Sequence, residues 1–145
     1  MIEIKETDII YKLDKNAANL KDIQIPSNTT VFDAEDCSNF YDLKGLQKLE
    51  NLRILILRNS GISSMDLKDI PKTVEIVDLR GCNLSSYANL PERPENPLRV
   101  LASFGGERLL NTFPPNVDIE MDGWIGSICS HKKREINMEN QKTRD

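Results

Sequence analysis

Long hydrophobic runs are missing from this sequence of 145 residues. Its longest uninterrupted apolar stretch, Ile54 to Leu57, is far shorter than the roughly 18 to 20 residues with which a helix crosses a membrane. The first residues, Met-Ile-Glu-Ile-Lys-Glu, have neither the basic start nor the apolar stretch of a signal peptide. We therefore expect a cytoplasmic or otherwise intracellular protein with no membrane partner.

Cysteine and histidine are scarce. Cys37, Cys82 and Cys129 are widely spaced and form no Cys-x-x-Cys pair, which disfavours both a disulfide framework and a zinc site. The single histidine, His131, begins a polar C-terminal stretch, where it is a poor base for a serine or cysteine nucleophile. Glycine motifs that cradle phosphate are also missing. The sequence therefore predicts no enzyme, no cofactor, no metal site and no small-molecule substrate.

Charge of both signs is plentiful but unevenly distributed. The chain has 19 basic and 23 acidic residues, of which residues 131–145 hold 5 and 3, so this tail carries +2 and the rest of the chain −6. An acidic body disfavours a nucleic-acid groove, whereas the basic tail offers weak support for RNA contact and stronger support for a solubility role. The one tight acidic cluster, Asp33, Glu35 and Asp36, is interpreted as a solvated face rather than a cation site, because calcium sites usually need more oxygen ligands in one loop.

A repeat occupies the middle of the chain. Residues 52–62 and 74–84 align position for position, with aliphatic residues at repeat positions 1, 4, 6 and 11. Weaker copies begin at Thr29 and Leu98. The pattern has the form Leu-x-x-Leu-x-Leu-x-x-Asn/Cys-x-Leu, and in this the chain resembles the leucine-rich repeat family. The ninth position, where the family often has asparagine, holds Cys37, Ser60, Cys82 and Gly106 here. We interpret the two cysteines as small buried residues with weak S–H donors.

The resemblance implies an α/β repeat fold, namely a short leucine-rich-repeat solenoid. Its curved parallel β-sheet would form the concave face, and short helical or irregular connectors would form the convex side. Apolar residues at every third position between Phe40 and Leu52 favour a tight helical turn there, and prolines before the later strands favour irregular connectors. We expect an N-terminal cap or degenerate first repeat over residues 1–28, repeats over 29–110, a C-terminal cap with Trp124 over 111–130, and a polar basic tail over 131–145.

The alternation of side chains along each strand predicts which residues face outward. Repeat position 3 is Val31, Ile54, Ile76 and Val100, and stacked strands would align these into an apolar stripe. An exposed apolar stripe with a charged rim resembles a protein-binding surface. Two alternatives stay open, that the termini fold over the stripe or that the register is wrong. The predicted partner-binding residues of the concave face are Val31, Ile54, Ile56, Arg58, Ile76, Asp78, Arg80, Val100 and Phe104.

These features predict a non-catalytic protein–protein interaction module that binds a protein partner through its concave face. Such a protein would be a small subunit or an assembly factor of a larger complex. One alternative is a ribonucleoprotein component whose basic tail contacts RNA. Another, suggested only by the proline connectors, is a pathogen effector that acts on host proteins.

Overall fold

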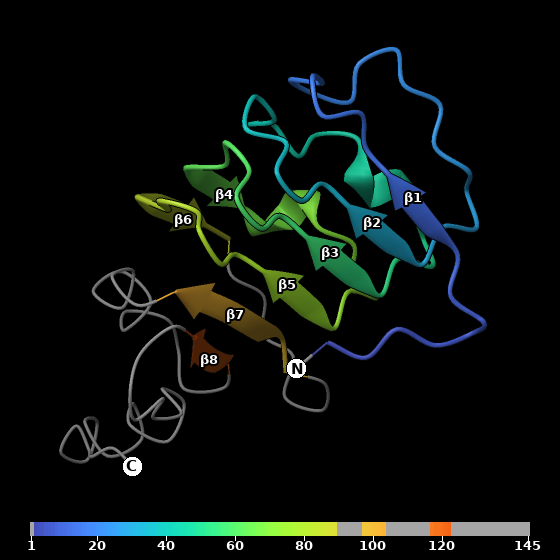
Figure 1. Cartoon of the computed structure of the whole chain (residues 1–145). Coiled ribbons are helices and arrows are strands. Elements are labelled where there is room, and N and C mark those ends of the chain that lie inside the picture. The colour runs from blue at the N-terminus through green and yellow to red at the C-terminus, as the bar shows by residue number, and fades with distance from the viewer. Residues whose placement is uncertain (1, 90–96, 104–116, 123–145) are drawn as a thin grey trace, which may run out of the picture.

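A computed structural model describes residues 2–89, 97–103 and 117–122 (Figure 1). Within these ranges the secondary structure consists of short β-strands and two single-turn 3₁₀ helices. The strands are β1 (Ile10–Lys12), β2 (Val31–Asp33), β3 (Ile54–Ile56), β4 (Ser64–Asp66), β5 (Ile76–Asp78), β6 (Ser86–Ala88), β7 (Arg99–Ser103) and β8 (Asp118–Asp122). The 3₁₀ helices are η1 (Leu46–Lys48) and η2 (Leu67–Asp69).

Six of the strands form one parallel sheet in the order β1-β2-β3-β5-β7-β8. The register aligns Ile10, Val31, Ile54, Ile76, Arg99 and Asp118 in one column across the sheet. Each strand therefore lies beside the strand of the next coil, and the chain winds as a repeat solenoid of parallel strands. This confirms the predicted solenoid architecture, which the sequence period indicates because one turn of chain supplies one strand.

The core lies on the inner face of this sheet. Alternate side chains of successive strands point inward and form one column, which consists of Tyr11, Phe32, Leu55, Val77, Val100 and Ile119. A second inward column continues it with Ala34, Leu57, Leu79 and Ala102. The aliphatic residues predicted to face inward in the two strong repeats do so.

The prediction that Val100 faces outward is wrong. Val100 pairs with Val77 of the inward column and is 2% exposed, and Arg99 takes the outward place beside Ile76. Strand β7, the strand of the repeat that begins at Leu98, is thus displaced by one residue from the predicted register. The reason is that a shift of one residue exchanges the two faces of a strand. This shift points Val100 and Ala102 into the core in place of Leu101 and the polar Ser103, which the predicted register placed inward.

The connectors contain very little helix. Leu43, Leu46, Leu49 and Leu52 are all buried, and the turn between them is η1, as their spacing of three residues predicts. The next connector contains β4 and η2 instead, and β4 pairs in parallel with β6 of the following coil. A second, two-stranded sheet therefore forms beside the main one.

Candidate functional site

The apolar stripe of the predicted binding face is not exposed. Val31 and Ile54 are both 0% exposed, and Ile56 and Ile76 are buried as well. Ile2 packs against the cluster formed by Val31, Ile54 and Ile56. Figure 1 shows the chain before β1 passing the starts of the strands, from the end near β7 to β1. The structure therefore matches the alternative in which a terminus folds over the stripe.

Polar contacts fasten this N-terminal segment, residues 2–9, to the sheet. Arg53 donates from Nη2 to Asp8 Oδ2 at 2.5 Å and to the carbonyl oxygen of Glu3 at 3.2 Å. The hydroxyl of Thr30 donates to Asp8 Oδ1 at 2.9 Å. The backbone N–H of Lys5 and the Arg53 guanidinium together lower the pKa of Asp8 to about 2. No local sequence pattern links Asp8 to Arg53, so sequence reasoning missed this contact.

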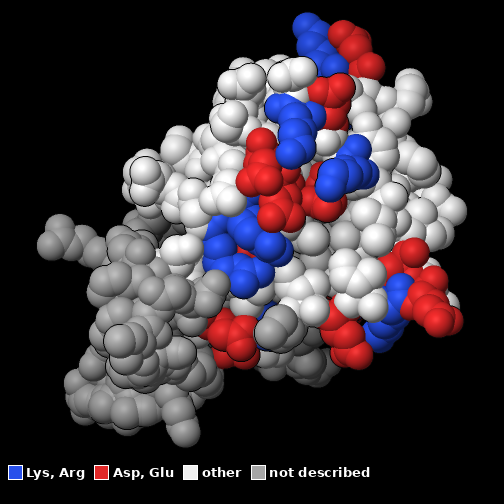
Figure 2. All heavy atoms as spheres, viewed as in Figure 1, with Lys and Arg blue, Asp and Glu red and all other residues white. Residues whose placement is uncertain are grey.

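A band of charged side chains occupies the outer face beyond the covered stripe, near the carboxyl ends of the strands (Figure 2). We call it the charged band, and its residues are Lys12, Asp33, Glu35, Arg58, Asp78 and Arg80. Figure 2 shows basic and acidic side chains in contact across the middle of this face. Successive coils supply these residues. The last residues of β1, β2, β3 and β5 form one outward column across the sheet, which consists of Lys12, Asp33, Ile56 and Asp78.

Asp78 is the centre of the charged band. Its side chain is 0% exposed and accepts hydrogen bonds from two guanidinium groups. Arg80 donates from Nε to Oδ1 at 2.9 Å and from Nη2 to Oδ2 at 2.8 Å, while Arg58 donates from Nε to Oδ2 at 3.0 Å. The other side of Arg58 reaches Glu35 Oε2 at 3.2 Å. Asp78 therefore holds both arginines in fixed positions on the outer face.

The ionised form of Asp78 is favoured despite its burial. Burial raises the pKa of Asp78, but the hydrogen bonds from the Arg80 side chain and backbone N–H and the charge of Arg58 outweigh this, so its pKa lies below the ordinary value. The arginine side chains stay partly accessible, 31% for Arg58 and 24% for Arg80. Guanidinium groups bind carboxylates with well-defined geometry. This arrangement suits recognition of an acidic or polar group on another protein.

The acidic cluster of residues 33–36 does not converge on one point. Asp33 lies 3.9 Å from Lys12 Nζ, Glu35 pairs with Arg58, and Asp36 lies 4.0 Å from Lys15 Nζ. Each carboxylate thus has its own cation. In the ranges that the structure describes, no three side chains of metal-ligating type come together in a group that would hold a metal ion.

Cys37 is buried, as its repeat position predicts, whereas Cys82 is only partly buried. Cys37 is 0% exposed, and its Sγ lies 3.7 Å from the carbonyl oxygen of Leu13 in the preceding coil. Cys82 Sγ lies 2.9 Å from the carbonyl oxygen of Leu57, again in the preceding coil. Burial raises the pKa of Cys37, which keeps it a thiol. Both residues therefore link neighbouring coils by weak hydrogen bonds.

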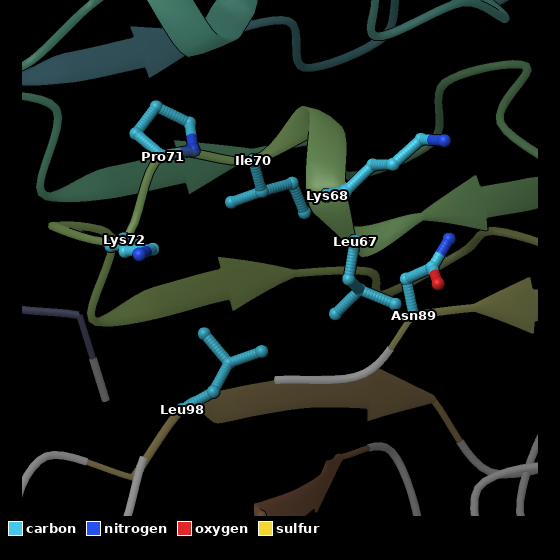
Figure 3. A pocket seen from close by; sticks show the side chains of 7 residues that line it. All are labelled: Leu67, Lys68, Ile70, Pro71, Lys72, Asn89 and Leu98. Carbon is cyan, nitrogen blue, oxygen red and sulfur yellow. The ribbon is translucent and has the colours of Figure 1, made fainter. Parts of the chain in front are cut away.

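A small cavity of about 260 Å³ lies on the connector side of the solenoid (Figure 3). Figure 3 shows it between η2, with the loop that follows it, and the start of β7. Its lining is mostly aliphatic and consists of Leu67, Lys68, Ile70, Pro71, Lys72, Asn89 and Leu98. The volume is below the roughly 300 to 1,000 Å³ of most small-molecule sites. No sequence signal indicated this cavity.

Several predicted features lie outside the described residues. They are Phe104 of the binding face, Trp124 of the C-terminal cap, Cys129, and the tail 131–145 with His131, which carries the RNA alternative. Within the described ranges, no helix combines the length and apolar character that crossing a membrane requires. No family model matches this chain, and no curated protein and no solved structure matches it.

Proposed function

We propose that this protein is a non-catalytic interaction module that binds a protein partner through the charged band. The observation that carries the proposal is the pair of arginines that buried Asp78 fixes on the outer face. Side chains that are already ordered lose little conformational entropy on binding, so more of the contact energy remains as affinity. Arginine is also among the residues that most often dominate the energy of protein interfaces.

The proposed binding surface lies beside the predicted apolar stripe, on the same outer face of the sheet. Ile2 packs on the predicted apolar stripe, whose residues are buried, and the accessible part of this face is the charged band, with Arg58 and Arg80 in its centre. An exposed rim of mixed charge favours a partner whose own surface carries carboxylates and amides. Electrostatic complementarity of this kind contributes to specificity and to the association rate.

We also propose that the solenoid is of the leucine-rich-repeat type and serves as a small subunit or assembly factor of a larger complex. Three features support this assignment. Repeat positions 4 and 6 of the strong repeats point into the core. At the ninth position, Cys37 and Cys82 contact carbonyl oxygens of the preceding coil. The 3₁₀ helix η1 lies in the connector that has a leucine at every third residue. Such solenoids commonly present extended binding surfaces.

The substitution Arg58→Ala tests the binding proposal. Asp78 keeps both of its hydrogen bonds to the Arg80 side chain, so the fold should persist while one guanidinium is lost from the face. Truncating a hot-spot arginine costs about 2 kcal/mol or more of binding free energy, which corresponds to a loss of about thirtyfold or more in affinity. Quantitative mass spectrometry of proteins captured by the tagged wild type and variant measures this loss.

Lys44→Ala is the matched control, because it removes the same charge from an exposed residue in the connector before η1. Circular dichroism and thermal melting show whether each variant is folded. We expect partners captured by the wild type and by Lys44→Ala to be depleted with Arg58→Ala. Equal capture by all three proteins would overturn the assignment of the charged band as the binding surface.

A further inference from the structure

Strand β1 forms an open edge of the main sheet. It is the terminal strand, and within the described part of the chain its one strand neighbour is β2. The carbonyl of Ile9 accepts from Val31 N and the N–H of Leu13 donates to Asp33 O, so odd-numbered backbone groups face β2. Because backbone groups alternate along a strand, the N–H and C=O groups of Ile10 and Lys12 point away from the sheet.

The apolar column of the sheet ends uncovered at this edge. Ile10 stands in the same column as Val31 and Ile54, yet it is 53% exposed whereas they are 0% exposed. Its neighbour Ile9 is 39% exposed. The N-terminal segment that covers the middle of the column thus leaves its last member open to an additional apolar side chain.

Two lysines mark the same edge. Lys12 lies 3.9 Å from Asp33 and Lys15 lies 4.0 Å from Asp36, and the two lysine side chains are 68% and 63% exposed. Asp14, the acidic residue between them, is engaged locally, since its Oδ1 accepts the N–H of Asn16 at 2.8 Å. In each of these ion pairs, the acid belongs to the coil of β2 and the lysine lies at the open β1 edge.

We propose that the β1 edge binds an extended segment of a partner protein as an additional parallel strand. The segment would place an apolar residue beside Ile10 and acidic residues beside Lys12 and Lys15. Strand β2 gives the pattern from the other side, with Val31, Asp33 and Asp36 beside these three residues. Backbone hydrogen bonds supply affinity in strand addition and the side-chain pattern supplies specificity. This inference rests on the proposed protein-binding function. It adds an adjoining surface, which shares Lys12 with the charged band, and gives it a defined partner chemistry.

A peptide that copies β2 is the probe. The peptide consists of residues 28–38, Asn-Thr-Thr-Val-Phe-Asp-Ala-Glu-Asp-Cys-Ser, with its cysteine replaced by serine and a fluorescent label at its N-terminus. Fluorescence anisotropy measures its binding to the full-length protein. We expect saturable binding that weakens at least tenfold when the peptide carries D33K and D36K. Equal binding of the two peptides, or binding of neither, would overturn the proposal.

Two protein variants show whether the edge is the binding surface. Ile10→Pro removes the outward N–H and keeps the carbonyl of Ile9 that β2 uses, a place where edge strands tolerate proline, so it should abolish binding without unfolding the chain. The double variant K12E/K15E should reverse the preference and bind the D33K/D36K peptide more tightly than the original. K44E/K48E, with the same charge change in the connector, should behave as the wild type.

The remaining outcomes separate this proposal from the others. Arg58→Ala should leave peptide binding unchanged, because Arg58 follows β3, two strands away from the β1 edge. Loss of captured partners without loss of peptide binding would therefore distinguish the Arg58 part of the charged band from the edge. Peptide binding that Ile10→Pro leaves intact would overturn the edge assignment. Concentration-dependent dimerisation in sedimentation experiments, abolished by Ile10→Pro, would assign the edge to a second copy of the chain and overturn the acidic-partner proposal.

Discussion

At the scale of single residues, arginine compensates for each of two carboxylates that the fold removes from water. Asp78 faces Arg58 and Arg80, and Asp8, whose side chain is 4% exposed, faces Arg53. A buried charge without partners costs several kcal/mol, so these carboxylates are tolerated only because the arginines and backbone donors surround them. The pairs of Asp78 with Arg58 and of Asp8 with Arg53 join residues 20 or more positions apart, whereas Arg80 follows Asp78 by two positions at the end of β5.

Asp8 makes the stability of the fold dependent on acid. Its pKa is about 2 in the folded chain against an ordinary value of 3.8, so its contribution is complete above about pH 4 and is lost as the pH falls toward 2. We expect Asp8→Asn to have a lower free energy of unfolding than the wild type at neutral pH. The difference in free energy between the two proteins should become smaller as the pH falls from about 4 to about 2. Urea unfolding across this range measures both curves. Curves that stay parallel would contradict the expectation.

At the scale of the strand and its turn, one conformation recurs after each central strand. Asp36, Asn59 and Gly81, at repeat position 8, all have a left-handed backbone with φ of 65°, 58° and 79°. Aspartate, asparagine and glycine are the residues that adopt this conformation most readily. At Gly81 a side chain is also excluded by space, because a Cβ there would lie 1.9 Å from Asn59 Oδ1. The repeat thus encodes its turn as well as its strand.

Two isoleucines of the outward column, Ile54 and Ile10, differ in burial and can be compared by the same substitution. Ile54→Ala should lower the free energy of unfolding by about 2 to 5 kcal/mol, the usual cost of truncating a buried isoleucine, because Ile54 is fully buried beneath the N-terminal segment. Ile10→Ala removes the same atoms from the same column at the exposed edge and should cost less than about 1 kcal/mol. Urea unfolding compares them. Equal small losses would show that the stripe is open to solvent.

At the scale of the whole molecule, each strand of the main sheet pairs only with the strands beside it. The stability of such a solenoid is approximately a sum over coils and their interfaces, and its ends open before its middle. At the β1 end, the inward contacts include Tyr11 stacked on Phe32, with ring centroids 5.9 Å apart, and the buried Leu13.

Hydrogen exchange should reveal this order. We expect amides of β1 to exchange faster than those of β3, and Tyr11→Ala to accelerate exchange in β1 while leaving β3 and β5 nearly unchanged. Leu55→Ala, in the fully buried centre of the same inward column, should accelerate exchange in every strand. Hydrogen-exchange mass spectrometry of the two variants and the wild type tests this. Uniform acceleration by Tyr11→Ala would mean that the chain unfolds as one cooperative unit.

The sequence by itself determined the winding of the chain and the inner face of its central coils. Leu55, Leu57, Val77 and Leu79 could be placed inward from sequence, because the alternation along a strand and the return of the pattern after 22 residues are local properties. The burial of Cys37 followed from its repeat position for the same reason.

The tertiary structure alone decided what covers the outer face. Burial of Ile54 depends on Ile2 crossing the sheet, and the ordering of Arg58 and Arg80 depends on their meeting at Asp78. Whether Val100 faces inward or outward depends on which face of β7 is shielded from water when β7 pairs with β5. These outcomes are set by contacts between distant segments and by desolvation, and neither the repeat period nor the charge of a single residue determines them.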